Sequence, residues 1–321
     1  MSLPSVLVDR LRLPVIASPM FLVSGPDLVI AQCTAGVVGS FPSLNARPLA
    51  ELRVWLTRIT EALAAHDAAH PEAPSAPFAV NLIVHRTNAR LAEDLALVEE
   101  FGVPIVITSL GARPEVNERI HAYGGIVLHD IIHDAYARKA VDKGADGLIA
   151  VAAGAGGHAG TQSPFALVQE IRAWFDGPLA LSGSIAHGRS VLAAEAAGAD
   201  LAYIGSLFIA TEEANAVPGY KQMVVDSSAA DIVYTDRFTG VHGNYLAPSI
   251  VAAGLDPARL AGAETGAIDF GDDGALGAKA WRDVWGAGHG VGAVSEVRPA
   301  AAVVDRLAVE YEAARERLLV R

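Results

Sequence analysis

Cysteine is nearly absent from this chain of 321 residues, which contains a single one, Cys33. One thiol excludes a disulfide within the chain and any metal or iron–sulfur site built from several cysteines. Cys33 lies in the apolar run LVIAQCTAGVV, so we predict a packed helix residue and not a nucleophile. The sequence therefore predicts no metal centre.

Basic side chains are also few, since 24 Lys and Arg stand against 36 Asp and Glu and give a formal net charge of -12. No cluster of Lys and Arg follows a phosphate-binding pattern, so we expect no nucleic-acid partner. The N-terminal stretch MSLPSVLVDRLRLP carries charges where a signal peptide needs an apolar core, and no stretch long enough to span a membrane lacks charges or helix breakers. We expect a soluble, cytoplasmic protein with no membrane contact.

Eight short apolar runs recur along the first two thirds of the chain, each followed by a stretch with apolar residues at helical spacing. The runs are PVIAS, GVVGS, FAVNLIV, PIVITS, GIVLHD, GLIAVAA, LALSGS and LAYIGS. They are continuous and not alternating, which is typical of parallel strands covered on both faces. Strand then helix, repeated eight times, predicts an α/β fold of the (β/α)8 TIM-barrel type, with a doubly wound open sheet as the alternative.

The alternation of apolar runs with helical stretches ends after Phe208, where polar residues and turns become more frequent. We predict a small lid subdomain, residues 211–275, inserted after the eighth strand and packed over the mouth of the barrel. Residues 1–210 and 276–321 would form the barrel. The final stretch AAAVVDRLAVEYEAARERLL is amphipathic and would return to the barrel wall.

Functional groups of a barrel of this kind lie in the loops that follow the strands. The seventh and eighth runs lead into SGSIAHGRS (182–190) and IGSLF (204–208), whose two Gly-Ser pairs offer backbone N–H groups to a phosphate. The alternative is that both are ordinary tight turns. His187 and Arg189 are interpreted as the exposed start of a helix.

The sixth run leads into GAGGHAG (154–160), where one imidazole, His158, stands among residues with almost no side chains. Glycine permits the close approach of a ligand, and an imidazole is the usual general base near neutral pH. We predict that His158 is catalytic. The alternative is a structural histidine whose ring nitrogens are satisfied by the protein.

Three motifs together resemble those of the nitronate monooxygenase family, formerly called 2-nitropropane dioxygenases. They are AGGHAG, SGSIAHGRSVLAAEAAGADLAYIGSLF and WGAGHGVGAV (285–294). The similarity runs from LPVIASPM to the last helix, and VNLIVHR and FTGVHGNYL look most like a bacterial, FMN-dependent subgroup.

The resemblance implies an FMN-bound TIM barrel that oxidises alkyl nitronates with O2, without a nicotinamide, to a carbonyl compound and nitrite. It places one group of residues against the flavin ring and another around the phosphate, with His158 as the base or as the group that orients the substrate. The implied cofactor residues are Ser18, Pro19, Met20, Asn81, His129, Gly156, Gly157, Ser182, Gly183, Ser184, Gly205 and Ser206.

The chain departs from the family pattern at several of these positions. The family's lysine near the end of the fifth strand is His129 here, and a neutral imidazole would stabilise an anionic reduced flavin less than a cation does. The commoner Gln and Glu are replaced by Val151 and Gly154, and the late motif AGQ reads AGH at residues 287–289. These differences concern the substrate more than the fold or the FMN.

Three residues are candidate substrate contacts, namely His242, Tyr245 and His289. For the first two, a turn with satisfied polar groups is the alternative. The expected partners are a small nitronate and O2, and a homodimer is a possible assembly.

Two other functions remain open on the same scaffold. One is an NAD(P)H-dependent FMN reductase of quinones or enoyl thioesters, which shares the barrel and needs no separate dinucleotide fingerprint. The other is a barrel that binds a phosphate ligand without redox chemistry.

Overall fold

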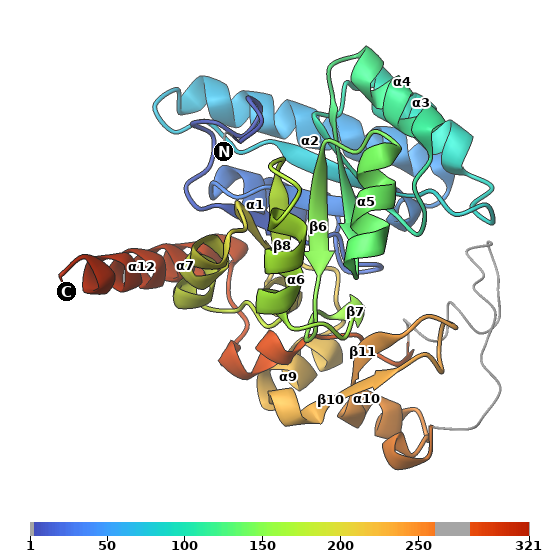
Figure 1. The fold of residues 1–321 in the computed structure, drawn as a ribbon, viewed down its shortest axis with the longest axis vertical. Helices are drawn as coiled ribbons and strands as arrows, with labels where there is room; N and C mark the ends of the chain where they lie inside the picture. The colour runs from blue at the N-terminus through green and yellow to red at the C-terminus, as the bar shows by residue number, and fades with distance from the viewer. Residues whose placement is uncertain (1–2, 261–282, 321) are drawn as a thin grey trace.

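The computed structural model of the chain describes residues 3–260 and 283–320. Residues 261–275 of the predicted lid and 276–282 of the predicted barrel lie outside the described residues. Eight parallel strands, alternating with helices, form a nearly closed barrel (Figure 1). The predicted (β/α)8 barrel is therefore confirmed.

The barrel strands coincide with the eight apolar runs of the sequence. They are β1 (Val15–Ala17), β2 (Gly39–Pro42), β3 (Phe78–Ile83), β4 (Ile105–Ser109), β5 (Ile126–Ile131), β6 (Gly147–Val151), β8 (Leu179–Ser182) and β9 (Leu201–Ile204). Their order is β1-β9-β8-β6-β5-β4-β3-β2. A parallel bridge between Ile16 and Val38 joins the last strand to the first. This closure excludes the open, doubly wound sheet.

Helices cover the outside of the barrel and lie beyond its mouth. They are α1 (Pro26–Thr34), α2 (Leu49–Ala69), α3 (Leu91–Glu100), α4 (Pro114–Ala122), α5 (Asp134–Asp142), α6 (Pro164–Arg172), α7 (Gly188–Ala197), α8 (Ser206–Ile209), α9 (Pro218–Asp226), α10 (Ala247–Ala252) and α12 (Ala300–Leu319). No helix within the described ranges is long and apolar enough to cross a membrane.

The last helix, α12, returns to the barrel wall as the sequence predicts. It buries Ala300, Val303, Val304 and Leu307, which share one helix face because they are three, four and seven residues apart. This face packs against α7 and α1. The helix therefore covers the wall beside the strand that closes the barrel.

Side chains of each barrel strand alternate between the interior and the surrounding helices. In β5, Leu128 packs in the interior with Ile107 and Ile149, whereas Val127 packs in the outer layer with Val116 of α4. The face on which a residue falls therefore decides whether it can reach the centre of the barrel.

A second, three-stranded antiparallel sheet lies outside the barrel. We call it the small sheet, and it consists of β10 (Ile232–Thr235), β11 (Gly243–Leu246) and β7 (Gly157–His158). β7 belongs to the loop after β6 and has no counterpart among the predicted strands. Figure 1 shows the small sheet, α9 and α10 on the side to which the β6 arrow points. The small sheet, α9 and α10 thus lie over the carboxyl ends of the barrel strands.

Candidate functional site

A cavity of about 790 Å³ lies at the carboxyl ends of the barrel strands. Each strand contributes at least one inward side chain to its floor, in the last part of the strand or directly after it. These side chains are Ser18, Pro42, Asn81, Ser109, Asp130, Val151, Ser182 and Tyr203. Most are polar, so the floor can form hydrogen bonds with a ligand. The volume falls within the range of roughly 300–1,000 Å³ that is usual for ligand sites.

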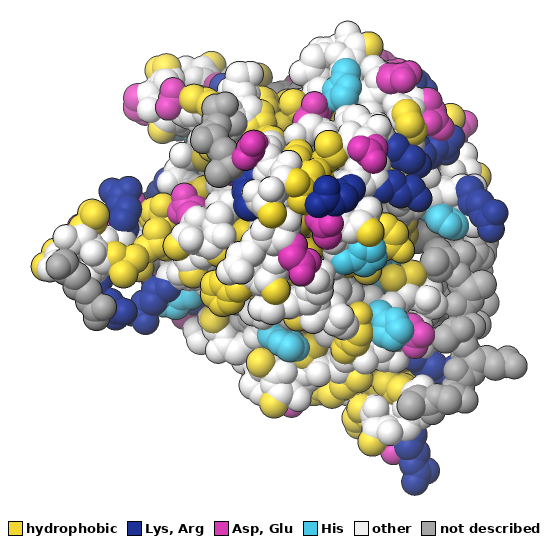
Figure 2. Space-filling view, in the orientation of Figure 1, with side chains coloured by type: hydrophobic (Ala, Val, Ile, Leu, Met, Phe, Trp, Pro, Cys, Tyr) yellow, Lys and Arg dark blue, Asp and Glu magenta, His cyan; other side chains and the backbone are white. Residues whose placement is uncertain are grey.

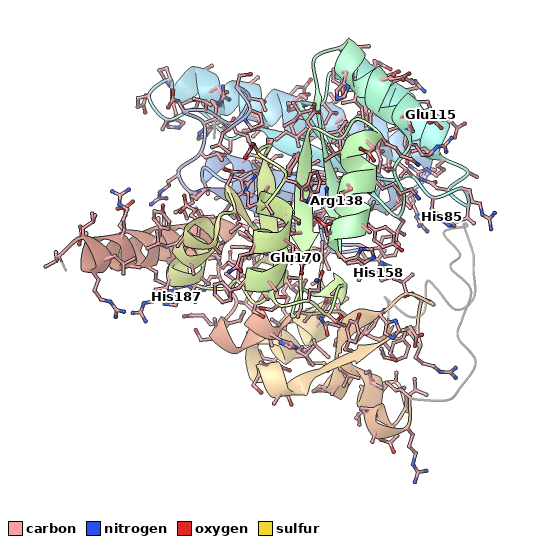
Figure 3. The ribbon with its side chains drawn as sticks, viewed as in Figure 1. His85, Glu115, Arg138, His158, Glu170 and His187 are labelled. Carbon is pink, nitrogen blue, oxygen red and sulfur yellow. The ribbon has the colours of Figure 1, made fainter. Side chains whose placement is uncertain are left out.

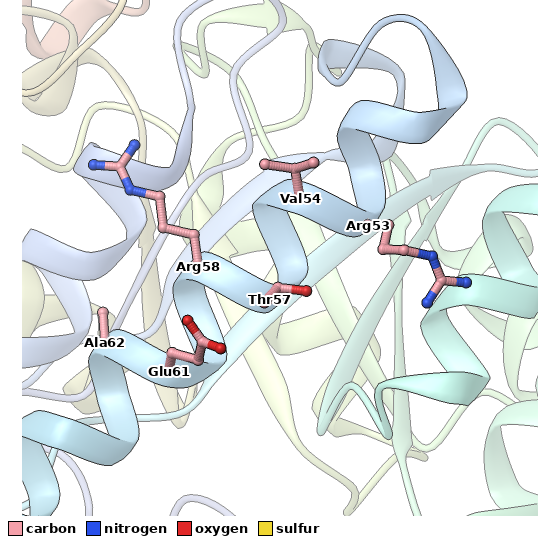
Figure 4. Close-up of a pocket in the computed structure, with 6 residues that line it drawn as sticks. All are labelled: Arg53, Val54, Thr57, Arg58, Glu61 and Ala62. Atoms are coloured by element: carbon pink, nitrogen blue, oxygen red, sulfur yellow. The ribbon is translucent and has the colours of Figure 1, made fainter.

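A second hollow lies on the outer face of α2 (Figure 4). Its two basic side chains are already paired, because Arg53 bonds to Glu100 and Arg58 to Asp27. These are exposed ion pairs on the surface of one helix, whereas the cavity at the strand ends gathers polar side chains from most strands of the barrel. The candidate site is therefore the cavity at the strand ends.

Asn81 is fixed on the cavity floor by two hydrogen bonds. Its Nδ2 donates to the carbonyl oxygen of Ile107 at 3.0 Å and to Ser109 Oγ at 2.7 Å. Both amide hydrogens are used, so Oδ1 is the atom that Asn81 offers to a ligand. The side chain can accept a hydrogen bond from a ring N–H.

Asp130 is a floor residue that the sequence analysis missed. Burial raises the pKa of its carboxyl to about 6, and a hydrogen bond from Ser109 counters part of that effect. Burial and, secondarily, the charge of Asp130 raise the pKa of Tyr203. The alternation in GIVLHD carried the signal, because Asp130 lies two residues after the inward-facing Leu128.

His129 lies on the other face of β5. It is two residues after Val127, which packs in the outer layer, and its Nδ1 lies 2.6 Å from the hydroxyl of Thr108. Burial, with a smaller effect from Lys143, lowers its pKa to about 4, so the ring is neutral at neutral pH. It borders the cavity from the side of α5, and its strand face does not support the predicted contact with the flavin ring.

His158 lies in β7, the strand of the small sheet that follows directly from the barrel strand β6 (Figure 3). Its backbone pairs with Gly243 of β11, and its Nε2 lies 3.0 Å from Thr239 Oγ1. Because that hydroxyl donates to the carbonyl of Val241 at 3.1 Å, it is placed to accept the hydrogen of Nε2. The proton-accepting nitrogen is then Nδ1.

Burial lowers the pKa of His158 to about 4. The imidazole is therefore neutral at neutral pH, which is the form that a general base requires. Within the parts of the chain that are described, no group of three or more His, Cys, Asp or Glu could hold a metal ion.

Two of the glycines predicted to bind the cofactor, Gly205 and Gly156, differ in what surrounds them. A Cβ on Gly205 would lie 3.4 Å from Ser18 Cβ and 3.6 Å from Met20 Sδ, so a side chain there would occupy the cavity itself. A Cβ on Gly156 would lie 2.7 Å from the backbone nitrogen of Gly288, so a side chain there would collide with the protein. Gly205 therefore leaves space for a ligand, and Gly156 permits two loops to pack.

Most of the site residues predicted from the sequence line this cavity. They are Ser18, Pro19, Met20, Asn81, His129, Gly156, Gly157, His158, Ser182, Gly205, Ser206 and His242. The structure thus brings together residues from loops that are far apart in the sequence. Their roles remain predictions.

Gly183, Ser184 and His289 are not among the residues that line the cavity. The backbone of Gly183 and Ser184 has positive φ angles of 126° and 58°. The N–H of Ser184 and that of His289 both donate to the carbonyl of Gly154, at 3.3 and 2.9 Å. These amides hold the loops together, which is a different use from the phosphate contact predicted for residues 183 and 184 and the substrate contact predicted for His289.

Tyr245 does not line the cavity. Its side chain is fully buried, its ring packs against Phe238 with centroids 5.0 Å apart, and its hydroxyl lies 3.5 Å from Thr239 Oγ1. Thr239 contacts both Tyr245 and His158, and the substrate contact of Tyr245 stays a prediction. The sequence analysis missed Thr239, which precedes the motif GVHGNYL by one residue.

Two interpretations of residues away from the cavity are confirmed. Cys33 is buried in α1, and burial raises the pKa of its thiol to about 12, so it is not a nucleophile. His187 is the N-cap of α7, where its side chain accepts the N–H of Arg189.

We expect the stability of the protein to fall on acidification because of His129. Its pKa is about 4 in the folded protein and 6.5 when unperturbed. Between these values the unfolded chain binds more protons, so the free energy of unfolding falls as pH drops from 6.5 to 4, by on the order of 3 kcal/mol for one such histidine. The free energy of unfolding, measured by urea denaturation at several pH values, should change less steeply with pH in His129→Gln than in the unaltered protein.

His129→Gln must be compared with the unaltered protein because the titration of Asp130 changes the free energy of unfolding with pH in the opposite direction. Its raised pKa makes the folded protein bind more protons up to about pH 6, which flattens the total pH dependence. His70→Gln, at an exposed position after α2, is the matched control and should leave the slope unchanged. An unaltered slope in His129→Gln would contradict the neutral, buried imidazole.

Comparison with known proteins gives consistent matches over most of the chain. The sequence profile of the family described as "Nitronate monooxygenase" matches residues 5–254. A nitronate monooxygenase from Paraburkholderia phytofirmans is 26% identical, over 79% of this chain and 78% of that protein. A crystal structure of a nitroalkane oxidase from Streptomyces ansochromogenes has a TM-score of 0.78 at 25% identity and covers 98% of this chain and 100% of that one.

A further relative has a different kind of name. The (3aS,4S,5R,7aS)-5-hydroxy-7a-methyl-1-oxo-octahydro-1H-indene-4-carboxyl-CoA dehydrogenase of Rhodococcus jostii is 26% identical over 74% of this chain. The chain spans 64% of the length of that protein.

Proposed function

Because the chain belongs to the nitronate monooxygenase family, and is thereby a flavin-dependent oxidoreductase, we propose that it binds FMN in the cavity and oxidises alkyl nitronates with O2 to a carbonyl compound and nitrite. The observation that carries the proposal is the position of His158. Its neutral imidazole lines the same cavity as Gly205, the position where a side chain would take the space of a ligand.

The residues of the cavity suit FMN. Ser182, Gly205 and Ser206 would surround the phosphate, Asn81 would accept a hydrogen bond at Oδ1, and Ser18, Pro19 and Met20 would pack against the ring. FMN would supply the electron acceptor for the reaction, which no side chain can provide. The protein supplies position, a polar anchor and exclusion of water.

His158 would handle the proton of a neutral nitroalkane. Its Nδ1 would take the proton from the carbon next to the nitro group, so that a C–H bond breaks, an N–H bond forms and the negative charge moves to the nitro oxygens. The resulting imidazolium would pair with those oxygens and hold the nitronate in the cavity. With a nitronate as substrate there is no proton to remove, and His158 would have to take a proton from solvent before it could pair with the nitro oxygens.

The segment 211–275 is the proposed lid. Within its described part, residues from α9, β10 and the turn between β10 and β11 line the cavity, namely Tyr220, Tyr234, Thr239, Gly240, Val241 and His242. They would close the space above the flavin and exclude water from it.

A specific observation supports the reductase alternative. The Rhodococcus relative is named for a reaction on a CoA thioester, and a carbonyl thioester would meet the same floor of hydrogen-bonding groups. In that case the flavin would exchange electrons with a nicotinamide or with the thioester and not with a nitronate.

The visible absorption spectrum of the purified protein tests the proposal. The protein should be yellow, and its flavin bands should bleach when propane-2-nitronate is added without oxygen and return when air is admitted. Nitrite should form in proportion to the nitronate consumed.

Two other results would reject the nitronate reaction. A yellow protein that ignores nitronate and is bleached by NADH or NADPH would be a reductase. A colourless protein that FMN does not reconstitute would be a phosphate-binding barrel without redox chemistry.

A further inference from the structure

The cavity extends beyond the centre of the barrel. Besides the floor residues, its lining includes a strip formed by the loop between β4 and α4 and by one side of α5. We call this strip the outer groove; it consists of Leu110, Gly111, Ala112, Ile132, Tyr136, Lys139 and Ala140. A small nitronate above a flavin has no use for a groove that continues past the strand ends onto a helix.

The charge along the cavity is opposite to that of the whole protein. Two of the charged side chains that line it, Arg47 and Lys139, are basic, and the carboxyl of Asp130 is the acidic one among the described lining residues. The chain as a whole carries a net charge of -12. A basic lining in an acidic protein favours an anionic ligand.

Lys139 is the basic side chain in the outer groove, and its neighbours are engaged elsewhere. Arg138 pairs with Asp134 at 2.8 Å, and Lys143 Nζ donates to the carbonyl of Ala112 at 2.7 Å. Lys139 has no hydrogen-bond or ion-pair partner among residues 3–260 and 283–320. Figure 2 shows Lys and Arg side chains gathered over α5.

Tyr136 supplies a flat surface beside this lysine. The two residues are three positions apart on α5 and therefore share a face of the helix. The ring of Tyr136 is held by stacking on His133, with centroids 4.0 Å apart, and half of the residue is exposed. An aromatic ring and a cation on one face suit a base joined to a phosphate.

Gly111 leaves the side of the outer groove formed by the loop between β4 and α4 without a side chain. A Cβ there would meet no atom within 4 Å, and the residue has a φ angle of +123°. The space above the loop is therefore open to a bulky group, and the positive φ favours glycine at this position.

We propose that the outer groove is a second subsite, which binds the phosphorylated nucleotide half of a large substrate or co-substrate while its reactive end reaches the cavity floor. The base lies against Tyr136 and a phosphate pairs with Lys139. CoA thioesters and NAD(P)H share this adenosine diphosphate chemistry. The proposal rests on the flavin site proposed above, because that site defines where the reactive end goes.

The test measures binding of coenzyme A and of NADPH, separately, to the FMN-loaded protein by isothermal titration calorimetry. At least one should bind, and Lys139→Glu should weaken that binding by about ten-fold or more. Tyr136→Ala should weaken it by roughly ten-fold through lost stacking. The probe that binds identifies the source of the nucleotide.

Arg315→Glu is the matched control, since it makes the same change in charge at an exposed position on α12, and it should leave binding unchanged. Absence of binding of both probes at millimolar concentration, or equal binding by Lys139→Glu, would overturn the proposal.

Turnover of propane-2-nitronate separates this proposal from the proposed function. Lys139→Glu should change that turnover less than two-fold, because a small nitronate does not reach the outer groove. Nucleotide binding without nitronate oxidation would reject only the nitronate reaction, and nitronate oxidation without nucleotide binding would reject only the groove.

Discussion

Replacement of His158 by Asn should lower kcat/KM for a neutral nitroalkane by roughly 100- to 10,000-fold, the usual contribution of a general base. The backbone pairing of residue 158 with Gly243 does not depend on the side chain, so the loop should keep its shape although the contact with Thr239 is lost. It can neither accept the proton nor carry the positive charge that holds the nitro oxygens. Steady-state oxygen consumption measures the effect.

The flavin spectrum and the melting temperature of His158→Asn should match those of the unaltered protein. His187→Asn is the matched control, because His187 is the N-cap of α7 and Asn is also a good N-cap. That variant should retain its activity. A fully active His158→Asn would remove the imidazole from the mechanism, whatever its position in the cavity.

Replacement of Gly205 by Val should abolish retention of the flavin, with an increase of at least about 100-fold in the dissociation constant of FMN. The backbone at Gly205 has φ -110°, which other residues adopt, and its added Cβ would touch only the edges of Ser18 and Met20. The new side chain thus fills the space of the ligand and not that of the protein. We expect a folded, colourless variant, detected by absorbance and by titration with FMN.

Gly219→Val is the control for the cost of a valine as such. Gly219 is exposed in α9, where a Cβ would make an ordinary contact of 3.6 Å with Trp285. It should retain the yellow colour. If Gly205→Val bound FMN as tightly as the unaltered protein, the cofactor would have to lie elsewhere in the cavity.

The barrel could be predicted almost strand by strand, because each strand is buried on both faces and is therefore a continuous apolar run. β5, for example, coincides with GIVLHD. β7 could not be predicted in this way. It has only two residues, Gly157 and His158, and exists because β11, far along the chain, offers a backbone edge to it.

Position after a strand was sufficient to predict many of the residues that line the cavity, whereas the face of the strand decides which of them point to its floor. His129 and Asp130 are adjacent in the sequence, but only Asp130 shares the inward face of Leu128. Tyr245 was chosen for its chemistry, whereas its burial in the core beside Phe238 depends on packing that the sequence does not display. Thr239 was missed because its importance comes from the imidazole that it contacts.

The pairing of His158 with Gly243 has a consequence for how substrates enter. The strand that carries the imidazole, β7, is hydrogen-bonded to β11 of the small sheet. The chain enters β7 directly from β6 of the barrel. If β10 and β11 moved away from the barrel, their hydrogen bonds to β7 would break or the imidazole would move with them. A substrate that enters through such an opening would therefore meet the imidazole of His158, the proposed base, displaced from its position in the cavity. A substrate that enters from the side, while the small sheet stays in place, would find the imidazole already in position for the reaction.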